Sequence, residues 1–169
     1  MIKPTAAFVS FKDVTVDFLK ENKIDAILLD VDNTVSPPSS KQIYEGVQDW
    51  LSEIKKSGVE VVICSNNFKK RVYPFAESIG LDCVAMSLKP LPFGFIRAKK
   101  KLSVNPKNAL VVGDQIFTDI LGAKFAGMKS VLLVPQSPDN GASIKIRRRM
   151  ELPIRKKLYG KNYLSEYHK

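Results

Sequence analysis

Four short runs of mainly apolar residues, each followed at once by polar or charged residues, constrain the fold of this chain most. They lie at residues 26–29, 59–64, 82–86 and 109–112. Short apolar runs bounded by polar turn residues are typical of buried β-strands. Segments with helical spacing lie between them, and such alternation predicts a parallel sheet with helices on both faces. The expected fold class is therefore α/β with three layers.

The elements between and after these strands can also be placed from the sequence. Helices are predicted at 42–56, 68–79, 92–102 and 116–126, and a last strand at 130–134. No repeat stands out, and 169 residues is an ordinary length for one domain, so we expect a single domain over 1–169.

The chemistry-bearing residues come directly after the predicted strands. In chain order they are Asp30, Asp32, Ser65, Lys89, Asp114 and Asp119. Ligands of open parallel sheets bind at the carboxyl ends of the strands, so these side chains are expected at one edge. Taken singly, each position also fits a turn, a helix cap or a solvated lysine. Their shared position after a strand is what predicts a site.

The first pair of acids, in Asp30-Val31-Asp32-Asn33-Thr34, is the most informative of these positions. Two carboxylates one residue apart can share a hard cation, while one acts as a nucleophile and the other as an acid and base. A turn-forming role for Asp32 and Asn33 alone would leave Asp30 unexplained, because it is a charge at the end of a buried strand.

The later positions add groups suited to a phosphate. The hydroxyl and amides of Ser65-Asn66-Asn67 can hold phosphoryl oxygens. Pro90 follows Lys89, so the backbone at Lys89 is expected to be extended rather than helical.

Together these motifs resemble those of the haloacid dehalogenase (HAD) superfamily of phosphotransferases, over roughly residues 24–135. The matching elements are Asp-x-Asp-x-Thr at 30–34, Ser65, Lys89 and Gly-Asp-x-x-x-x-Asp at 113–119. The Asp-Asn-Thr variant and Lys-Pro-x-Pro at 89–92 are similar to bacterial subfamily IIIA phosphatases of the YqeG type. That group is related to mitochondrial phosphatases that act on phosphatidylglycerophosphate. The resemblance implies a Rossmann-like, HAD-like fold.

The resemblance also implies a Mg²⁺-dependent phosphatase that forms an aspartyl-phosphate intermediate. Asp30 would be the nucleophile and a metal ligand. Asp32 would be the acid and base, with its backbone carbonyl as a ligand. Ser65 and Lys89 would hold the phosphoryl group. Asp114 would bind the metal, and Asp119 would hold metal-bound water or orient Lys89.

The spacing of the motifs predicts that no cap domain covers the site. There are 32 residues between Asp32 and Ser65 and 23 between Ser65 and Lys89, each about one loop, helix and strand. An open site suits a large or surface-anchored substrate that excludes water on docking. The resemblance favours phosphatidylglycerophosphate. The alternatives are a phosphatase of sugar or nucleotide phosphates, and an RNA- or ribosome-binding protein on a HAD scaffold. The complete acid set argues against the last.

Positive charge is concentrated near the C-terminus. The formal net charge is +10, and residues 140–169 contribute +7 of it. The basic residues of this segment are Lys145, Arg147, Arg148, Arg149, Arg155, Lys156, Lys157, Lys161 and Lys169. Apolar residues alternate with them, which predicts a basic amphipathic helix that breaks before Pro153.

Such a helix can pack its apolar side on the sheet, or lie on an anionic membrane or nucleic acid. We expect the packing, with a membrane or RNA role left open for the outer face and nucleic acid ranked after membrane. None of the basic residues is expected in the catalytic site.

The remaining features bear on location. Cys64 and Cys83 lie on predicted core strands and are expected to be reduced and buried. No apolar run approaches the ~20 residues of a membrane-spanning helix, and the N-terminus has no apolar signal region. His168, near the end, is expected to be a tail residue rather than a catalyst. A cytoplasmic location, with peripheral contact at the membrane, is the prediction; the oligomeric state is not predicted.

Overall fold

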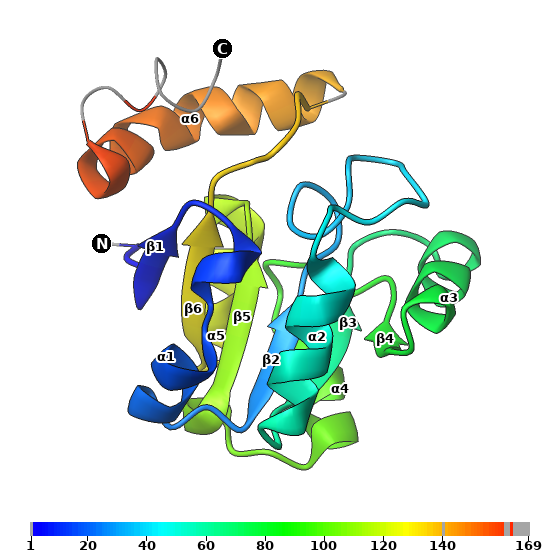
Figure 1. The fold of residues 1–169 in the computed structure, drawn as a ribbon. Coiled ribbons are helices and arrows are strands. Elements are labelled where there is room, and N and C mark those ends of the chain that lie inside the picture. Colours follow the sequence, from blue (N-terminus) through cyan, green and yellow to red (C-terminus); the bar gives the residue numbers. More distant parts are fainter. Residues whose placement is uncertain (1, 140, 161–162, 164–169) are drawn as a thin grey trace.

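The computed structural model describes residues 2–139, 141–160 and 163. A sheet of six parallel strands runs through it in the order β1-β6-β5-β2-β3-β4 (Figure 1). The strands are β1 (Ala6–Phe8), β2 (Ala26–Leu29), β3 (Glu60–Cys64), β4 (Asp82–Val84), β5 (Ala109–Gly113) and β6 (Lys129–Leu133). The predicted strands and the α/β fold class are confirmed. Strand β1 was not predicted, because three residues carry too little pattern.

The register of the central strands sets where the site lies. Leu29 of β2 is level with Val112 of β5 and with Ile63 of β3. The order of the strands reverses at β2, since the chain continues to β3 on one side and β5 lies on the other. This switch point is where open α/β sheets form a ligand crevice. The residues that follow β2, β3 and β5 therefore emerge side by side.

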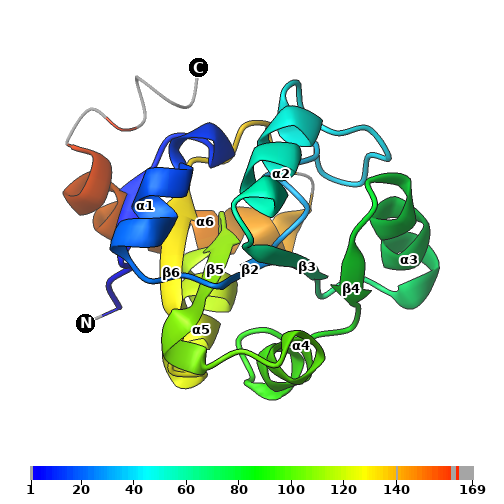
Figure 2. The same ribbon diagram turned by 60° about the horizontal axis from the view of Figure 1, so that its bottom comes forward.

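Helices cover both faces of the sheet (Figure 2). Helices α1 (Val16–Glu21), α2 (Val47–Lys56) and α3 (Lys69–Ser78) lie on one face, and α4 (Phe93–Leu102) and α5 (Leu121–Phe125) lie on the other.

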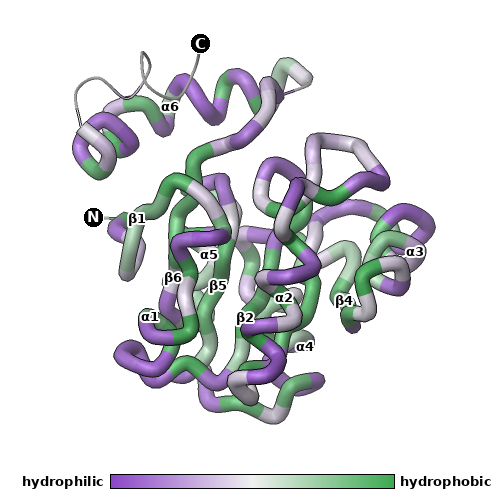
Figure 3. Tube along the Cα trace, in the orientation of Figure 1, coloured by the Kyte–Doolittle hydropathy of each residue, from purple (hydrophilic) through white to green (hydrophobic). Residues whose placement is uncertain are grey.

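The side chains of β2 alternate between the two faces, as the pleat of a strand requires. Ile27 and Leu29 pack with Trp50 in the larger core cluster, and Leu28 packs with Phe95 in the smaller one. Figure 3 shows hydrophobic colour along these central strands. Burial on both faces is the usual state of a parallel sheet.

The predicted helices are present with changed boundaries. Helix α2 begins at Val47 rather than at 42, because Gly46 is left-handed with φ of 85°. The predicted helix at 116–126 is a π-helical segment, Ile116–Ile120, followed by α5. Between Asp32 and Lys89 the chain holds only loops, α2, β3, α3 and β4, which confirms the absence of a cap domain there.

Helix α6 (Ala142–Tyr159) lies across the carboxyl edge of the sheet (Figure 1). It confirms the predicted basic helix, but the predicted break is wrong, because the helix continues through Pro153. Tyr159 anchors it by donating a hydrogen bond to the carbonyl oxygen of Leu132 at 2.7 Å. Among the described residues, no helix is both long and apolar enough to cross a bilayer. Lys161, His168 and Lys169 lie outside the described residues.

The two cysteines differ in burial. Both thiols are free; Cys64 is buried, and burial raises its pKa to about 11. Cys83 is only partly buried, since β4 is an edge strand, so the predicted burial of Cys83 is wrong.

Candidate active site

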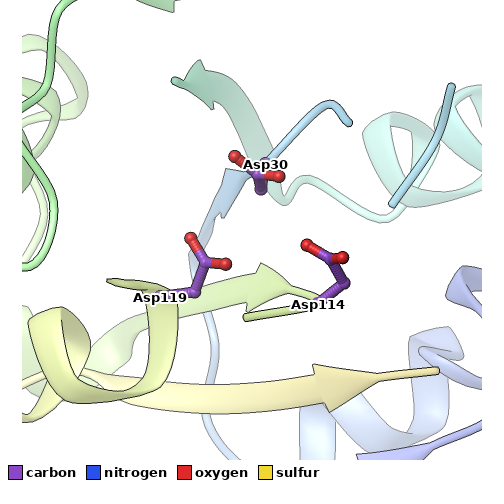
Figure 4. A group of neighbouring side chains, drawn as sticks. All are labelled: Asp30, Asp114 and Asp119. Atoms are coloured by element: carbon purple, nitrogen blue, oxygen red, sulfur yellow. The ribbon is translucent and has the colours of Figure 1, made fainter. Parts of the chain in front are cut away.

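Three carboxylates meet where β2 and β5 end (Figure 4). Asp30, Asp114 and Asp119 are all buried, and each offers an oxygen within 4.8 Å of the others. Asp30 directly follows β2, and its N–H donates to the carbonyl oxygen of Val112 at 2.9 Å. The sheet register therefore brings together acids that are more than eighty residues apart in the sequence.

Gly113 allows Asp119 to reach this cluster. A Cβ atom on Gly113 would collide with the carboxylate of Asp119, so only glycine fits there. The same carboxylate accepts a hydrogen bond from the Gln115 N–H at 3.1 Å. The turn after β5, which contains Gly113 and Gln115, therefore fixes the position of the Asp119 carboxylate.

Lys89 places one positive charge among these acids. Its Nζ atom lies 2.5 Å from Asp30 Oδ1, 2.7 Å from Asp119 Oδ1 and 2.8 Å from the carbonyl oxygen of Cys64. Burial acts to lower the pKa of Lys89, but the neighbouring Asp119 and Asp30 outweigh it and raise that pKa. The ammonium group is therefore charged and uses all of its donors.

Asn66 holds the backbone of Lys89 in place. Its side-chain oxygen accepts from the Lys89 N–H at 2.7 Å, and its amide donates to the Lys89 carbonyl at 3.0 Å. Lys89 is not helical, as predicted, and its peptide bond to Pro90 is cis. The sequence indicated a phosphate-binding amide at Asn66. In the structure this amide binds the Lys89 backbone instead.

The cations beside the acidic cluster do not offset the burial of its carboxylates. Burial raises the pKa of Asp30 to about 8 and that of Asp114 to about 6, against the lowering effects of Lys89 and Arg148 respectively. Asp114 Oδ1 is buried and has no hydrogen-bond partner among the described residues. Clustered carboxylate oxygens suit a hard divalent cation such as Mg²⁺. The residues present therefore fit the predicted metal.

Asp32 lies apart from the carboxylate cluster. Its carboxylate accepts from the Asn67 amide at 2.7 Å and the Ser39 N–H at 3.0 Å, and it pairs with the Arg71 guanidinium. Arg71 was not predicted, because an arginine in the first turn of α3 belongs to no recognisable pattern. Asn67 was expected to face phosphate, but its amide is engaged by Asp32.

Five of the six predicted residues line one cavity of about 210 Å³. Asp30, Asp32, Ser65, Lys89 and Asp114 all contribute to its wall. Asp119 is not among the lining residues, since it is buried against Lys89. Ser65 is buried, and its hydroxyl accepts from the Asn67 N–H at 3.2 Å.

Helix α6 also reaches this cavity, which the sequence did not predict. Arg148 pairs with the carboxylate of Asp114 and donates to its carbonyl oxygen at 2.6 Å. Arg155, which is fully buried, donates to the same carbonyl and pairs with buried Glu151 at 2.9 Å. The expectation that the basic residues lie outside the site is therefore wrong for Arg148, which pairs with Asp114, and for Arg147, which lines the cavity. An amphipathic pattern does not indicate which arginine of a basic run turns inward.

Comparison with known proteins identifies the family. A family model described as haloacid dehalogenase-like hydrolase matches residues 11–127. The chain belongs to the haloacid dehalogenase-like hydrolases. The predicted superfamily and the predicted class, phosphoric monoester hydrolase, are both confirmed.

Similar proteins extend this result. The chain is 30% identical over 151 residues to the probable phosphatase YqeG of Bacillus subtilis, covering 89% of this chain and 88% of that protein. It is 31% identical over 102 residues to phosphoglycolate phosphatase 1 of Pseudomonas aeruginosa, covering 54% of this chain but 37% of that protein. A solved structure of an uncharacterized protein from Listeria monocytogenes serotype 4b shares the fold. Its TM-score is 0.57 at 17% identity, over 70% of this chain and 84% of that one.

Proposed function

We propose that this HAD-family phosphatase hydrolyses phosphatidylglycerophosphate through an aspartyl-phosphate on Asp30. The observation that carries the catalytic part is the grouping of Asp30, Asp32 and Lys89 on one cavity with Asp114. Such a set combines a nucleophile, an acid and base, and charge neutralisation.

The phosphoryl group would sit on the floor of the cavity. Ser65 holds one non-bridging oxygen, and Lys89 turns the donor that it gives to Asp30 toward another, which offsets the repulsion between an anionic ester and the Asp30 carboxylate. Mg²⁺, held by Asp30, Asp114 and the Asp32 carbonyl with Asp119 nearby, would supply further charge neutralisation.

Two steps then follow at Asp30. Its carboxylate oxygen bonds to phosphorus while the bond from phosphorus to the leaving alcohol breaks, and Asp32 gives a proton to the departing oxygen. Asp32 next removes a proton from water, whose oxygen attacks phosphorus and frees Asp30 and inorganic phosphate. Arg71 and Asn67 hold the Asp32 carboxylate in position for both transfers.

An exposed apolar patch beside the site supports a lipid substrate. We define the Lys89-loop patch as Phe68, Met86, Leu88, Leu91 and Phe93. All five are exposed, Phe68 to 75% and Phe93 to 58%. The N–H of Met86 donates to the carbonyl of Asn67 at 3.0 Å, which places Phe68 close to the loop that carries Lys89. Apolar side chains exposed around an active site suit docking at a lipid surface.

Loss of the Lys89-loop patch tests the lipid substrate. Phe68→Ser with Phe93→Ser should lower turnover of phosphatidylglycerophosphate in anionic vesicles at least several-fold and leave p-nitrophenyl phosphate turnover unchanged. Phe125→Ser is the matched control, since Phe125 is 59% exposed on α5. Equal turnover of the lipid by the double variant and wild type would argue against the patch.

The second candidate is a phosphatase of small soluble phosphates. The cavity of about 210 Å³ is small, and the similarity to a phosphoglycolate phosphatase favours a compact substrate. A substrate screen that places phosphatidylglycerophosphate micelles beside phosphoglycolate, sugar phosphates and nucleotides separates the two. Preference for a soluble phosphate by a large factor in kcat/KM would overturn the lipid proposal. RNA or ribosome binding, and a cytoplasmic location, stay predictions.

A further inference from the structure

Helix α6 supplies part of the cavity wall through Ile144 and Arg147. The floor of the same cavity is made by Asp30, Ser65 and Lys89, which hold a phosphoryl group in the proposed function. The rest of the substrate then occupies the remainder of the cavity, which Ile144 and Arg147 help to line.

The position of α6 against the site is fixed by buried polar contacts. Glu151, which is fully buried, accepts from the N–H of Ile116 at 2.7 Å and pairs with Arg155 at 2.9 Å. Arg148 pairs with Asp139 at 2.6 Å and with the carboxylate of Asp114. Separating such buried charges from their partners is strongly unfavourable. These contacts therefore hold α6 against the site. Arg147 directly precedes Arg148, which pairs with Asp114.

Among the described residues, Arg147 differs from the other cations of the cavity in having no acidic partner. Lys89 pairs with Asp30 and Asp119, and Arg71 pairs with Asp32. The Arg147 side chain makes no ion pair within residues 2–139, 141–160 and 163, and its one hydrogen bond to these residues is a long 3.4 Å contact to the carbonyl of Ser143. Its charge at the cavity wall is open to a ligand.

We propose that Arg147 is a specificity-determining residue that binds a second anionic group, a carboxylate or a phosphodiester, on the leaving group of the substrate. A guanidinium can hold either group through paired hydrogen bonds. The inference rests on the proposed function, because the floor must take the phosphoryl group for Arg147 to face the leaving group.

The test compares substrates that differ in the second charge. Glycerophosphoglycerol phosphate carries a phosphodiester and phosphoglycolate a carboxylate, whereas glycerol 3-phosphate has an uncharged leaving alcohol. Arg147→Ala should lower kcat/KM about 10- to 100-fold for a doubly anionic substrate, from the usual strength of charged hydrogen bonds. The value for glycerol 3-phosphate should stay within about twofold, and Arg147→Lys should restore part of the loss.

Arg149→Ala is the matched control, because Arg149 is exposed on the same helix and lines no part of this cavity. It should leave all three substrates unchanged. The loss in kcat/KM for glycerophosphoglycerol phosphate, compared with the loss for phosphoglycolate, shows which anion Arg147 prefers. An equal loss for charged and uncharged substrates in Arg147→Ala, or no loss for any, would overturn the assignment while leaving the phosphatase itself intact.

A binding measurement keeps the inference testable without turnover. In an Asp30→Asn background, Arg147→Ala should weaken calorimetric binding of glycerophosphoglycerol phosphate but not of inorganic phosphate. If wild type hydrolyses none of the three substrates, the proposed function fails. Equal binding of the diester with and without Arg147 would then reject the inference as well.

Discussion

The floor of the cavity and the part of its wall that α6 supplies differ in how the positions of their residues are encoded. The floor residues Asp30, Ser65 and Lys89 follow β2, β3 and β4, and the register of these strands brings them together. The wall residues Ile144 and Arg147 belong to a basic helix. In that helix Arg148 and Arg155 turn inward while Arg149 is exposed. The end of a strand in a parallel sheet fixes where the next side chain lies. A helical pattern fixes only which side chains share a face, and the packing of the helix in the fold decides what that face contacts.

Among the residues of the floor, a change at Asp30, the proposed nucleophile, should have the largest effect on turnover. Asp30→Asn should lower kcat for p-nitrophenyl phosphate by about 10³-fold or more, because an amide cannot form the acyl phosphate. Asp32→Asn should also lower turnover severely, since the leaving group loses its proton donor. Asp17→Asn, at an exposed position on α1, is the control. Near wild-type turnover by the Asp30 variant would exclude the covalent mechanism.

Metal dependence distinguishes the acids of the carboxylate cluster from one another. EDTA should stop hydrolysis and Mg²⁺ should restore it, with Ca²⁺ a poor substitute because it takes more ligands in a looser geometry. Asp114→Ala should raise the Mg²⁺ concentration needed for half-maximal activity more than Asp119→Ala, because Asp119 also serves Lys89. A Mg²⁺ titration of each variant measures this. Full activity in EDTA would contradict the role given to the cluster.

A substitution of Arg148 tests whether α6 stabilises the fold through its contacts with Asp114 and Glu151. Arg148→Ala would leave the buried Asp114 and Glu151 without this partner, so unfolding free energy should fall by about 3–5 kcal/mol, as when a buried pair is broken. Arg149→Ala, one residue on and exposed, should change it by less than about 0.5 kcal/mol. Urea titrations of both variants give the comparison. Similar small losses would mean that α6 is not anchored through Arg148.

The outer face of α6 should have the smallest effect on turnover. Lys145, Arg149 and Lys156 are exposed, and reversing their charges should leave p-nitrophenyl phosphate hydrolysis within about twofold. Binding to anionic vesicles should weaken, at about 1 kcal/mol for each basic residue, and the difference should fade as salt rises. Co-sedimentation at two salt concentrations measures this. Salt-sensitive RNA binding without vesicle binding would favour the nucleic-acid alternative.

The sequence alone determined the parallel sheet and the positions of Asp30, Asp32, Ser65, Lys89, Asp114 and Asp119. Local patterns suffice there, because an apolar strand ends where its polar residues begin and parallel strands end at one edge. The grouping of Asp30, Asp114 and Asp119 followed from the same rule. The short elements β1 and α1 carried too few residues for a pattern.

Only the tertiary structure decided which other side chains complete the site. Arg71 reaches Asp32 from the first turn of α3, and Arg148 reaches Asp114 because α6 docks across the sheet edge. Both contacts join segments that are far apart in the chain. A basic amphipathic helix has many charges that could face inward, and the buried Asp114 and Glu151 with the partly buried Asp139 select among them.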